Sequence, residues 1–196
     1  MVIDQVHDLQ TIFRKVLHTL SRPGEIESIQ FVGEKSESIQ SIYETTFLVL
    51  NTLFDNEINF HLITESSNSV IDMIIGYTLA RFTSIEQADF IVVLQDADEA
   101  KVVSAIEQCK KGTLIEPNTS STWIIETSFS KQDGRPIHLT GPGIKDQKHF
   151  STTLSDSIWR KRNQHVVDYP LGIDFILIDN EHQIAGIPRT TKVEVK

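Results

Sequence analysis

The C-terminal quarter of the chain contains two apolar β-type segments, YPLGIDFILI at residues 169–178 and IPRTTKVEV at residues 187–195. Residues 173–178 and 184–187 predict two strands, and the polar turn at 179–183 favours an antiparallel hairpin. Pro188 should end the second strand, because proline cannot donate to a ladder. In such a hairpin Asp174 comes opposite residue 188 or 189.

The polar residues inside these segments form a candidate site. Asp174 shares its side of the strand with apolar residues, and a buried carboxylate needs a cationic or hydrogen-bonding partner, for which Arg189 is the candidate. Arg189, Thr190 and Thr191 together offer a planar donor fork and two hydroxyls, a set suited to phosphate or phosphonate oxygens. A structural ion pair, a contact with another subunit and a ligand site all remain open.

Helix-type and strand-type patterns alternate through the first half of the chain, and strands gather in the second half. The spacing predicts helices at 4–21, 38–54, 69–81, 98–109 and 153–166, and further strands at 25–32, 58–64, 88–94, 122–127 and 137–140. The apolar stripe of the first helix, which should face the core, consists of Val6, Leu9, Phe13, Val16, Leu17 and Leu20. This order predicts an α/β fold with a mixed, mostly parallel sheet and helices on both faces.

Length and composition limit the function classes. A chain of 196 residues fits a single domain, residues 1–196. Its formal net charge of −9 opposes nucleic-acid binding. It has no apolar run of about 18 residues and no signal-like start, so we expect no membrane association and a cytoplasmic location.

Motifs for metals and cofactors are absent from the sequence. Cys109 is the only cysteine, so it forms no intrachain disulfide, and we expect it to be buried. The histidines form neither HExxH nor HxH, and there is no Walker loop, nucleophile elbow or dinucleotide fingerprint. We therefore predict no metal and no cofactor.

Two other motifs have a functional and a structural interpretation. Gly141-Pro142-Gly143 could present backbone N–H groups to an anion, but the proline removes one donor, which favours a structural turn. Trp159-Arg160-Lys161-Arg162 could form a basic patch, but consecutive helical residues point about 100° apart, which favours a solvated helix face.

Four segments in order resemble a known family. They are Ser21-Arg22-Pro23-Gly24; Gly112-Thr113-Leu114 with Pro117 and Thr122; Leu139-Thr140-Gly141-Pro142-Gly143-Ile144; and the PLGID and IPRTT motifs of the C-terminal quarter. Together they are similar to the PhnH family, the H subunit of the bacterial carbon–phosphorus lyase core complex. On this basis Arg22, Gly141 and Gly143 join Asp174, Arg189, Thr190 and Thr191 as candidate ligand or interface residues, with no catalytic residue assigned.

The resemblance implies a fold and a function. The fold implied is that of the large domain of pyridoxal-phosphate-dependent transferases, without the cofactor. The function implied is that of an accessory subunit, inactive alone, that pairs with itself and assembles with the G, I and J subunits. That complex converts ATP and an alkylphosphonate to ribose 1-alkylphosphonate 5-triphosphate and adenine, and a shared site for ATP or phosphonate is implied with it. The alternative is a self-sufficient small-molecule transferase of similar fold, for which no lysine of the sequence stands out as a Schiff-base residue.

Overall fold

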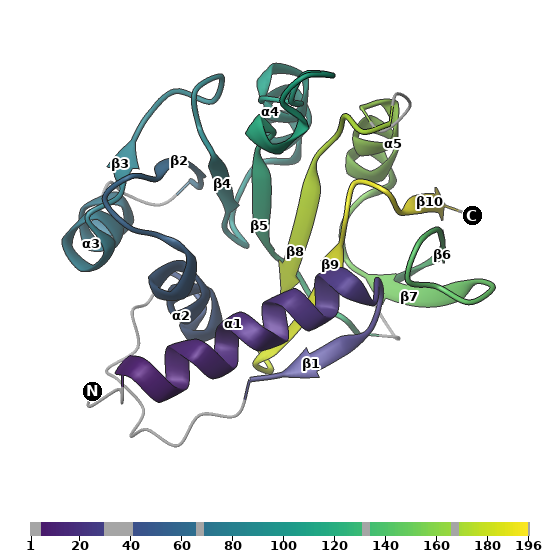
Figure 1. Cartoon of the computed structure of the whole chain (residues 1–196), viewed down its shortest axis with the longest axis horizontal. Coiled ribbons are helices and arrows are strands. Elements are labelled where there is room, and N and C mark those ends of the chain that lie inside the picture. Colours follow the sequence, from purple (N-terminus) through teal and green to yellow (C-terminus); the bar gives the residue numbers. More distant parts are fainter. Residues whose placement is uncertain (1–4, 30–40, 66–68, 131–133, 166–168, 196) are drawn as a thin grey trace.

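The computed structural model describes residues 5–29, 41–65, 69–130, 134–165 and 169–195 (Figure 1). Its helices are α1 (Gln5–Ser21), α2 (Glu44–Leu53), α3 (Ser69–Thr78), α4 (Glu99–Gln108) and α5 (Asp156–Gln164). Its strands are β1 (Ile26–Ser28), β2 (Asn59–Ile63), β3 (Arg81–Phe82), β4 (Phe90–Val93), β5 (Thr122–Glu126), β6 (Arg135–Thr140), β7 (Lys148–Thr152), β8 (Asp174–Ile178), β9 (Gln183–Ile187) and β10 (Lys192–Val195).

Seven strands form the large sheet, in the order β1-β9-β8-β5-β4-β2-β3. The five strands from β8 to β3 are parallel to one another, and β9 runs antiparallel to both of its neighbours. The predicted mixed, mostly parallel sheet is therefore confirmed.

The predicted C-terminal hairpin is also confirmed. Strands β8 and β9 pair antiparallel, with Phe175 opposite Ile187 and Ile178 opposite Ile184. Continuing this register places Asp174 opposite Pro188, directly after the last residue of β9. The two strands fix where Asp174 and Arg189 can meet.

Helices cover both faces of the large sheet, as predicted. Because side chains alternate along a strand, Phe175 and Leu177 of β8 join one apolar cluster, while Ile176 and Ile178 join the other. The first cluster packs under α4 and α5, and the second packs under α1, α2 and α3. Figure 1 shows α1 crossing in front of the sheet beside α2.

A second sheet of three antiparallel strands, β10-β6-β7, was not predicted. The sequence KHFST of β7 has no apolar run, and only Phe150 and Thr152 of this strand are buried. Strand β7 forms because β6 lies beside it and pairs with it. Ile137, Leu139, Phe150 and Val193 of the small sheet share a cluster with residues of the large sheet. That the chain forms one domain stays a prediction, as does the likeness to the transferase large domain.

Several predicted boundaries were wrong. Helix α2 begins at Glu44, and the predicted start at 38–40 lies outside the described residues. Helix α3 ends at Thr78 because Leu79 has φ of 62°, a left-handed conformation that terminates helices, and residues 81–82 then pair with β2. Helix α5 begins at Asp156 and not at 153, because β7 extends to Thr152 and residues 153–155 form the connection between the two elements. The strand predicted at 25–32 is described only to 29, and β1 covers three of its residues.

The orientation predicted for the first helix was also wrong in part. Ile12 and Val16 of α1 are buried, whereas Phe13 and Leu17 remain 44% and 51% exposed. A Cβ at Gly186 of β9 would lie 2.7 Å from the backbone nitrogen of Leu20 and the carbonyl carbon of Thr19. Because the helix backbone approaches the strand this closely, the side of α1 that carries Thr19 faces the sheet. Among the helices that the structure describes, none is long and apolar enough to cross a membrane.

Candidate functional site

Asp174 and Arg189 form a charge-assisted pair at the end of the β8–β9 hairpin. Arg189 Nε lies 3.2 Å from Asp174 Oδ1 and 3.1 Å from Oδ2, and Nη2 lies 2.5 Å from Oδ2. The backbone N–H of Arg189 also donates to Oδ1 at 2.7 Å. Each side chain retains 18% of its exposure. The predicted, partly buried contact is confirmed.

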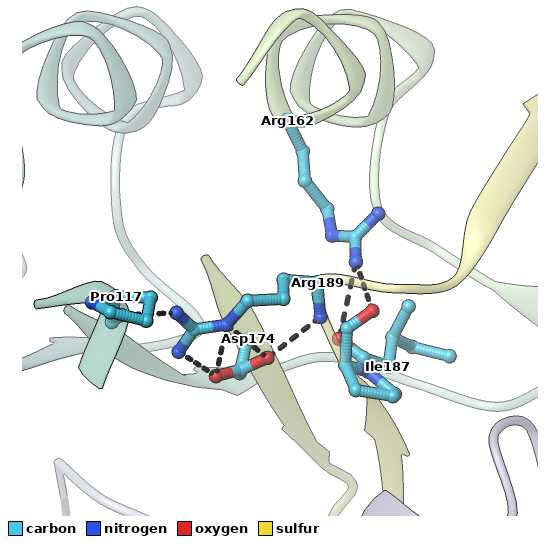
Figure 2. A network of polar contacts seen from close by, with 6 residues as sticks. Pro117, Arg162, Asp174, Ile187 and Arg189 are labelled. Carbon is cyan, nitrogen blue, oxygen red and sulfur yellow. Dashed lines mark hydrogen bonds and ion pairs between the residues drawn. The ribbon is translucent and has the colours of Figure 1, made fainter. Parts of the chain in front are cut away.

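The position of this pair favours a structural role. Arg189 Nη1 donates to the carbonyl of Pro117 at 2.6 Å, so the guanidinium also binds the loop before β5 (Figure 2). Asp174 is the first residue of β8 and pairs with Thr122, the first residue of β5. The pair therefore lies where the parallel strands begin, whereas open parallel sheets bind ligands beyond the carboxyl ends of their strands.

Arg162 was expected on a solvated helix face, but it is 0% exposed. Its Nη2 donates to the carbonyls of Ile187 and Pro188 at 3.3 and 2.7 Å (Figure 2). Its Nη1 donates to the carbonyl of Thr191 at 3.2 Å. The guanidinium carbon also lies 5.3 Å from the centre of the Phe175 ring. Burial lowers the pKa of Arg162 to about 10, and the charge of Asp174 opposes this change. Arg162 thus holds the segment that carries Arg189.

One feature of the sequence agrees with the burial of Arg162, although it does not specify it. Trp159, three residues earlier on α5, is also fully buried, and residues three apart share one side of a helix. The prediction of a solvated face does hold for Arg160, whose side chain is 73% exposed, while Lys161 forms an ion pair with Glu107. Backbone carbonyls replace water around Arg162, and sequence patterns do not reveal them.

Thr190, Thr191 and Gly141 lie close together, but they approach one another through their backbones and not through polar side chains. The N–H of Thr191 donates to the carbonyl of Pro188 at 2.9 Å, closing a turn. Thr191 is fully buried, and its hydroxyl has no hydrogen-bond partner among the described residues. Gly141 has φ of +137°, and a Cβ there would lie 2.8 Å from the carbonyl oxygen of Thr190. The loop after β6 therefore packs directly on the IPRTT turn, and the Thr191 hydroxyl does not face solvent.

Arg22 and Gly143 belong to a separate depression of about 390 Å³. The N–H of Ile144 donates to the carbonyl of Gly141 at 3.1 Å, which confirms the structural turn predicted for residues 141–143. With φ of +84°, Gly143 lies so close to the end of α1 that a Cβ would be 2.5 Å from the Ser21 carbonyl oxygen. The structure thus divides the predicted site residues into two groups. Asp174, Arg189, Thr190, Thr191 and Gly141 form one group, and Arg22 and Gly143 form the other. The loop after β6 joins the two groups, because it carries both Gly141 and Gly143.

Sequence reasoning missed two buried carboxylates at the opposite edge, where β5 and β8 end. Glu126 accepts hydrogen bonds from the N–H groups of Tyr43 and Gln95 at 2.7 and 3.1 Å, and burial raises its pKa. Asp179 accepts from the N–H groups of residues 181 and 183, and burial likewise raises its pKa. Burial and the charges of both carboxylates raise the pKa of Tyr43 to about 12. An acidic residue directly after a run of apolar residues, as at both positions, is the signal that could have identified them.

A groove of about 640 Å³ lies between β2 and α4. His61 Nδ1 lies 2.7 Å from the carbonyl oxygen of Thr83 and must be the donor to it, and the imidazole stacks on Phe82 with ring centres 5.4 Å apart. Within the described ranges, no three histidine, cysteine or acidic side chains gather as metal ligands. Cys109 is buried, as predicted, and burial raises its pKa to about 11.

Comparison with known proteins gives one family over nearly the whole chain. Residues 2–194 match the family model described as "Bacterial phosphonate metabolism protein (PhnH)". One curated relative, the "Putative C-P lyase subunit protein HtxG" of Stutzerimonas stutzeri, is 26% identical over 188 residues, which cover 95% of this chain and 86% of that protein.

A second relative is the "Alpha-D-ribose 1-methylphosphonate 5-triphosphate synthase subunit PhnH" of Rhizobium meliloti (strain 1021). It is 26% identical over 197 residues, which cover 97% of this chain and 92% of the relative. The match extends over both sheets and all four motif segments, so the similarity is not confined to one part of the fold. The chain belongs to the PhnH family of bacterial phosphonate metabolism proteins.

Proposed function

We propose that this chain is an accessory subunit of a carbon–phosphorus lyase complex in phosphonate metabolism. The observation that carries the proposal is the family match over residues 2–194. Two relatives with subunit names span nearly the same length, which supports a role within an assembly. The complex would use ATP and an alkylphosphonate to form ribose 1-alkylphosphonate 5-triphosphate and adenine, in the cytoplasm.

The geometry supports an accessory role over an independent catalytic one. The ionic groups of the C-terminal motif are occupied by internal contacts, since Arg189 donates to Asp174 through its side chain and its backbone N–H, and to the carbonyl of Pro117 through Nη1. Arg162 is likewise held by three carbonyls. The self-sufficient transferase considered from the sequence gains no support from the names of the relatives.

The test is reconstitution. The purified chain alone, incubated with ATP and methylphosphonate, should release no adenine, and addition of the G, I and J subunits should restore release, measured by chromatography. The chain should also copurify with those subunits, and a strain lacking the gene should regain growth on methylphosphonate when it is supplied. Adenine release by the isolated chain, or full activity of G, I and J without it, would contradict the proposal.

Self-association is part of the proposal. The family resemblance implies a symmetric dimer, and Phe13 and Leu17 of α1 offer exposed apolar surface that a partner could bury. A specific dimer should bury more than about 1,000 Å² in total. Light scattering should give twice the chain mass at micromolar concentration, and a monomer at every concentration would contradict this part.

A further inference from the structure

The depression that contains Arg22 and Gly143 has the chemistry of an oxyanion site. It lies between the corner that joins α1 to β1 and the loop from β6 to β7, two segments far apart in the sequence. Its charged lining consists of three cations and two carboxylates, contributed by Arg22, Lys145, Lys148, Glu25 and Asp146. In a chain with a formal charge of −9, this is a local excess of positive charge.

The donors of these cations are not used up by the protein. The Arg22 side chain is 59% exposed, and its closest carboxylate oxygen, on Glu25, is 3.7 Å away, beyond hydrogen-bond distance. The Lys148 ammonium lies 3.4 Å from the other Glu25 oxygen. Among the described contacts, neither cation donates a side-chain hydrogen bond, and Lys145 has no ion pair. Glu25 therefore sits between two cations that retain donors for another group.

We infer that this depression binds a phosphono group, the doubly charged PO₃ end of a phosphonate or phosphate. A guanidinium binds two such oxygens through parallel N–H donors, and an ammonium adds a compact charge beside it. A volume of about 390 Å³ lies within the range of small-ligand sites. Glu25 is the counter-ion that keeps the cations together without ligand, and it competes with the ligand for them.

The inference rests on these side chains and not on the proposed function. The assay below uses the isolated full-length chain, so binding and the complementation assay can fail independently. Two sources carry the same group: a free alkylphosphonate, or the end of a polyphosphate such as a 5-triphosphate. Methylphosphonate and inorganic tripolyphosphate represent them as probes, with inorganic phosphate as a third. Similar affinities would assign a single phosphono group, and tenfold tighter tripolyphosphate binding would assign the polyphosphate tail.

The test is a titration followed by calorimetry and by amide chemical shifts of residues 22–25 and 143–148. Arg22→Ala and Lys148→Ala should each weaken binding about fivefold to tenfold, the loss expected for one partly exposed charge-assisted contact. Glu25→Gln removes the competing carboxylate and should tighten binding several-fold, an effect that a purely structural ion cluster would not produce. Arg135→Ala and Arg160→Ala are matched controls, because both cations are exposed and pair with Asp156 instead.

Two results would overturn the inference. One is the absence of binding of all three probes to the wild-type chain at up to about 10 mM. The other is equal weakening by Arg22→Ala and by the two control substitutions, which would mean that the chain attracts anions only through its general charge. Since Arg22 is largely exposed, its substitution should leave the thermal unfolding curve unchanged, so loss of binding cannot be confused with loss of fold.

Discussion

The two edges of the large sheet at which β5 and β8 begin and end stabilise buried charge with opposite backbone groups, carbonyls at the first and N–H groups at the second. At the edge where β5 and β8 begin, Arg162 and Arg189 donate to the carbonyls of Pro117, Ile187, Pro188 and Thr191. At the edge where these strands end, Glu126 accepts from the backbone N–H groups of Tyr43, before α2, and Gln95, after β4, and Asp179 accepts from those of residues 181 and 183. The difference is that Arg189 also has a carboxylate partner, whereas Glu126 has no ion pair among the described residues. Charge at both edges is therefore used to hold loops.

Removal of Arg162 should have the largest effect on stability. Arg162→Ala removes a donor from the carbonyls of Ile187, Pro188 and Thr191, of which Pro188 keeps the Thr191 N–H, and it removes the packing of the side chain on Phe175. We expect a loss of about 4 kcal/mol in the free energy of unfolding, measured by urea denaturation. Arg162→Lys should recover only part of it, because one ammonium cannot reproduce the planar fork.

The matched control for this prediction is on the same helix. Arg160→Ala removes an exposed guanidinium and should change the free energy of unfolding by no more than about 0.5 kcal/mol. Equal effects of the two substitutions would show that Arg162 contributes no more than a surface charge.

Removal of Arg189 should have the next largest effect. Arg189→Ala leaves Asp174 partly buried with only a backbone donor, and we expect a loss of about 3 kcal/mol in the free energy of unfolding. Asp174→Asn/Arg189→Ala should lose less than the sum of its single substitutions, because the two groups form one interaction.

The same variant also distinguishes fold support from ligand binding. If the pair serves a ligand, Arg189→Ala should retain its melting temperature and abolish growth on methylphosphonate in the complementation assay. A variant that retains both properties would reduce this motif to a surface feature and would remove the contrast between the edges.

The smallest effect should be the pH dependence contributed by Glu126. Because burial raises its pKa in the folded state, the folded protein holds this proton more tightly than the unfolded chain does. The corresponding stability is fully present below the ordinary glutamate value of 4.5 and is lost as the pH rises through the raised pKa. Burial also raises the pKa of Asp179 above its ordinary value of 3.8, so its contribution to stability is likewise lost as the pH rises.

The measurement is the free energy of unfolding against pH. Glu126→Gln should give a flatter profile from pH 4.5 upward than the wild-type chain, while Glu57→Gln, at an exposed position, should leave the profile unchanged. A steeper profile in Glu126→Gln would mean that the backbone donors of Tyr43 and Gln95 outweigh burial.

The sequence by itself determined the alternation of helices and strands, the apolar core strands and the hairpin that brings Asp174 opposite Pro188. These features depend on hydrophobic periodicity and on turn residues, which act over a few neighbouring positions. The contact between Asp174 and Arg189 followed from them, because an antiparallel register fixes which residues meet across two strands.

Only the tertiary structure decided the second sheet, the inward side of α1 and the burial of Arg162. Strand β7 has a mostly polar sequence, and it becomes a strand because β6 pairs with it. The face of α1 is set by its close approach to Gly186, more than 160 residues away. Arg162 is stable in the interior because carbonyls of residues 187–191 converge on it. Each of these outcomes depends on groups distant in the chain, which no local pattern specifies.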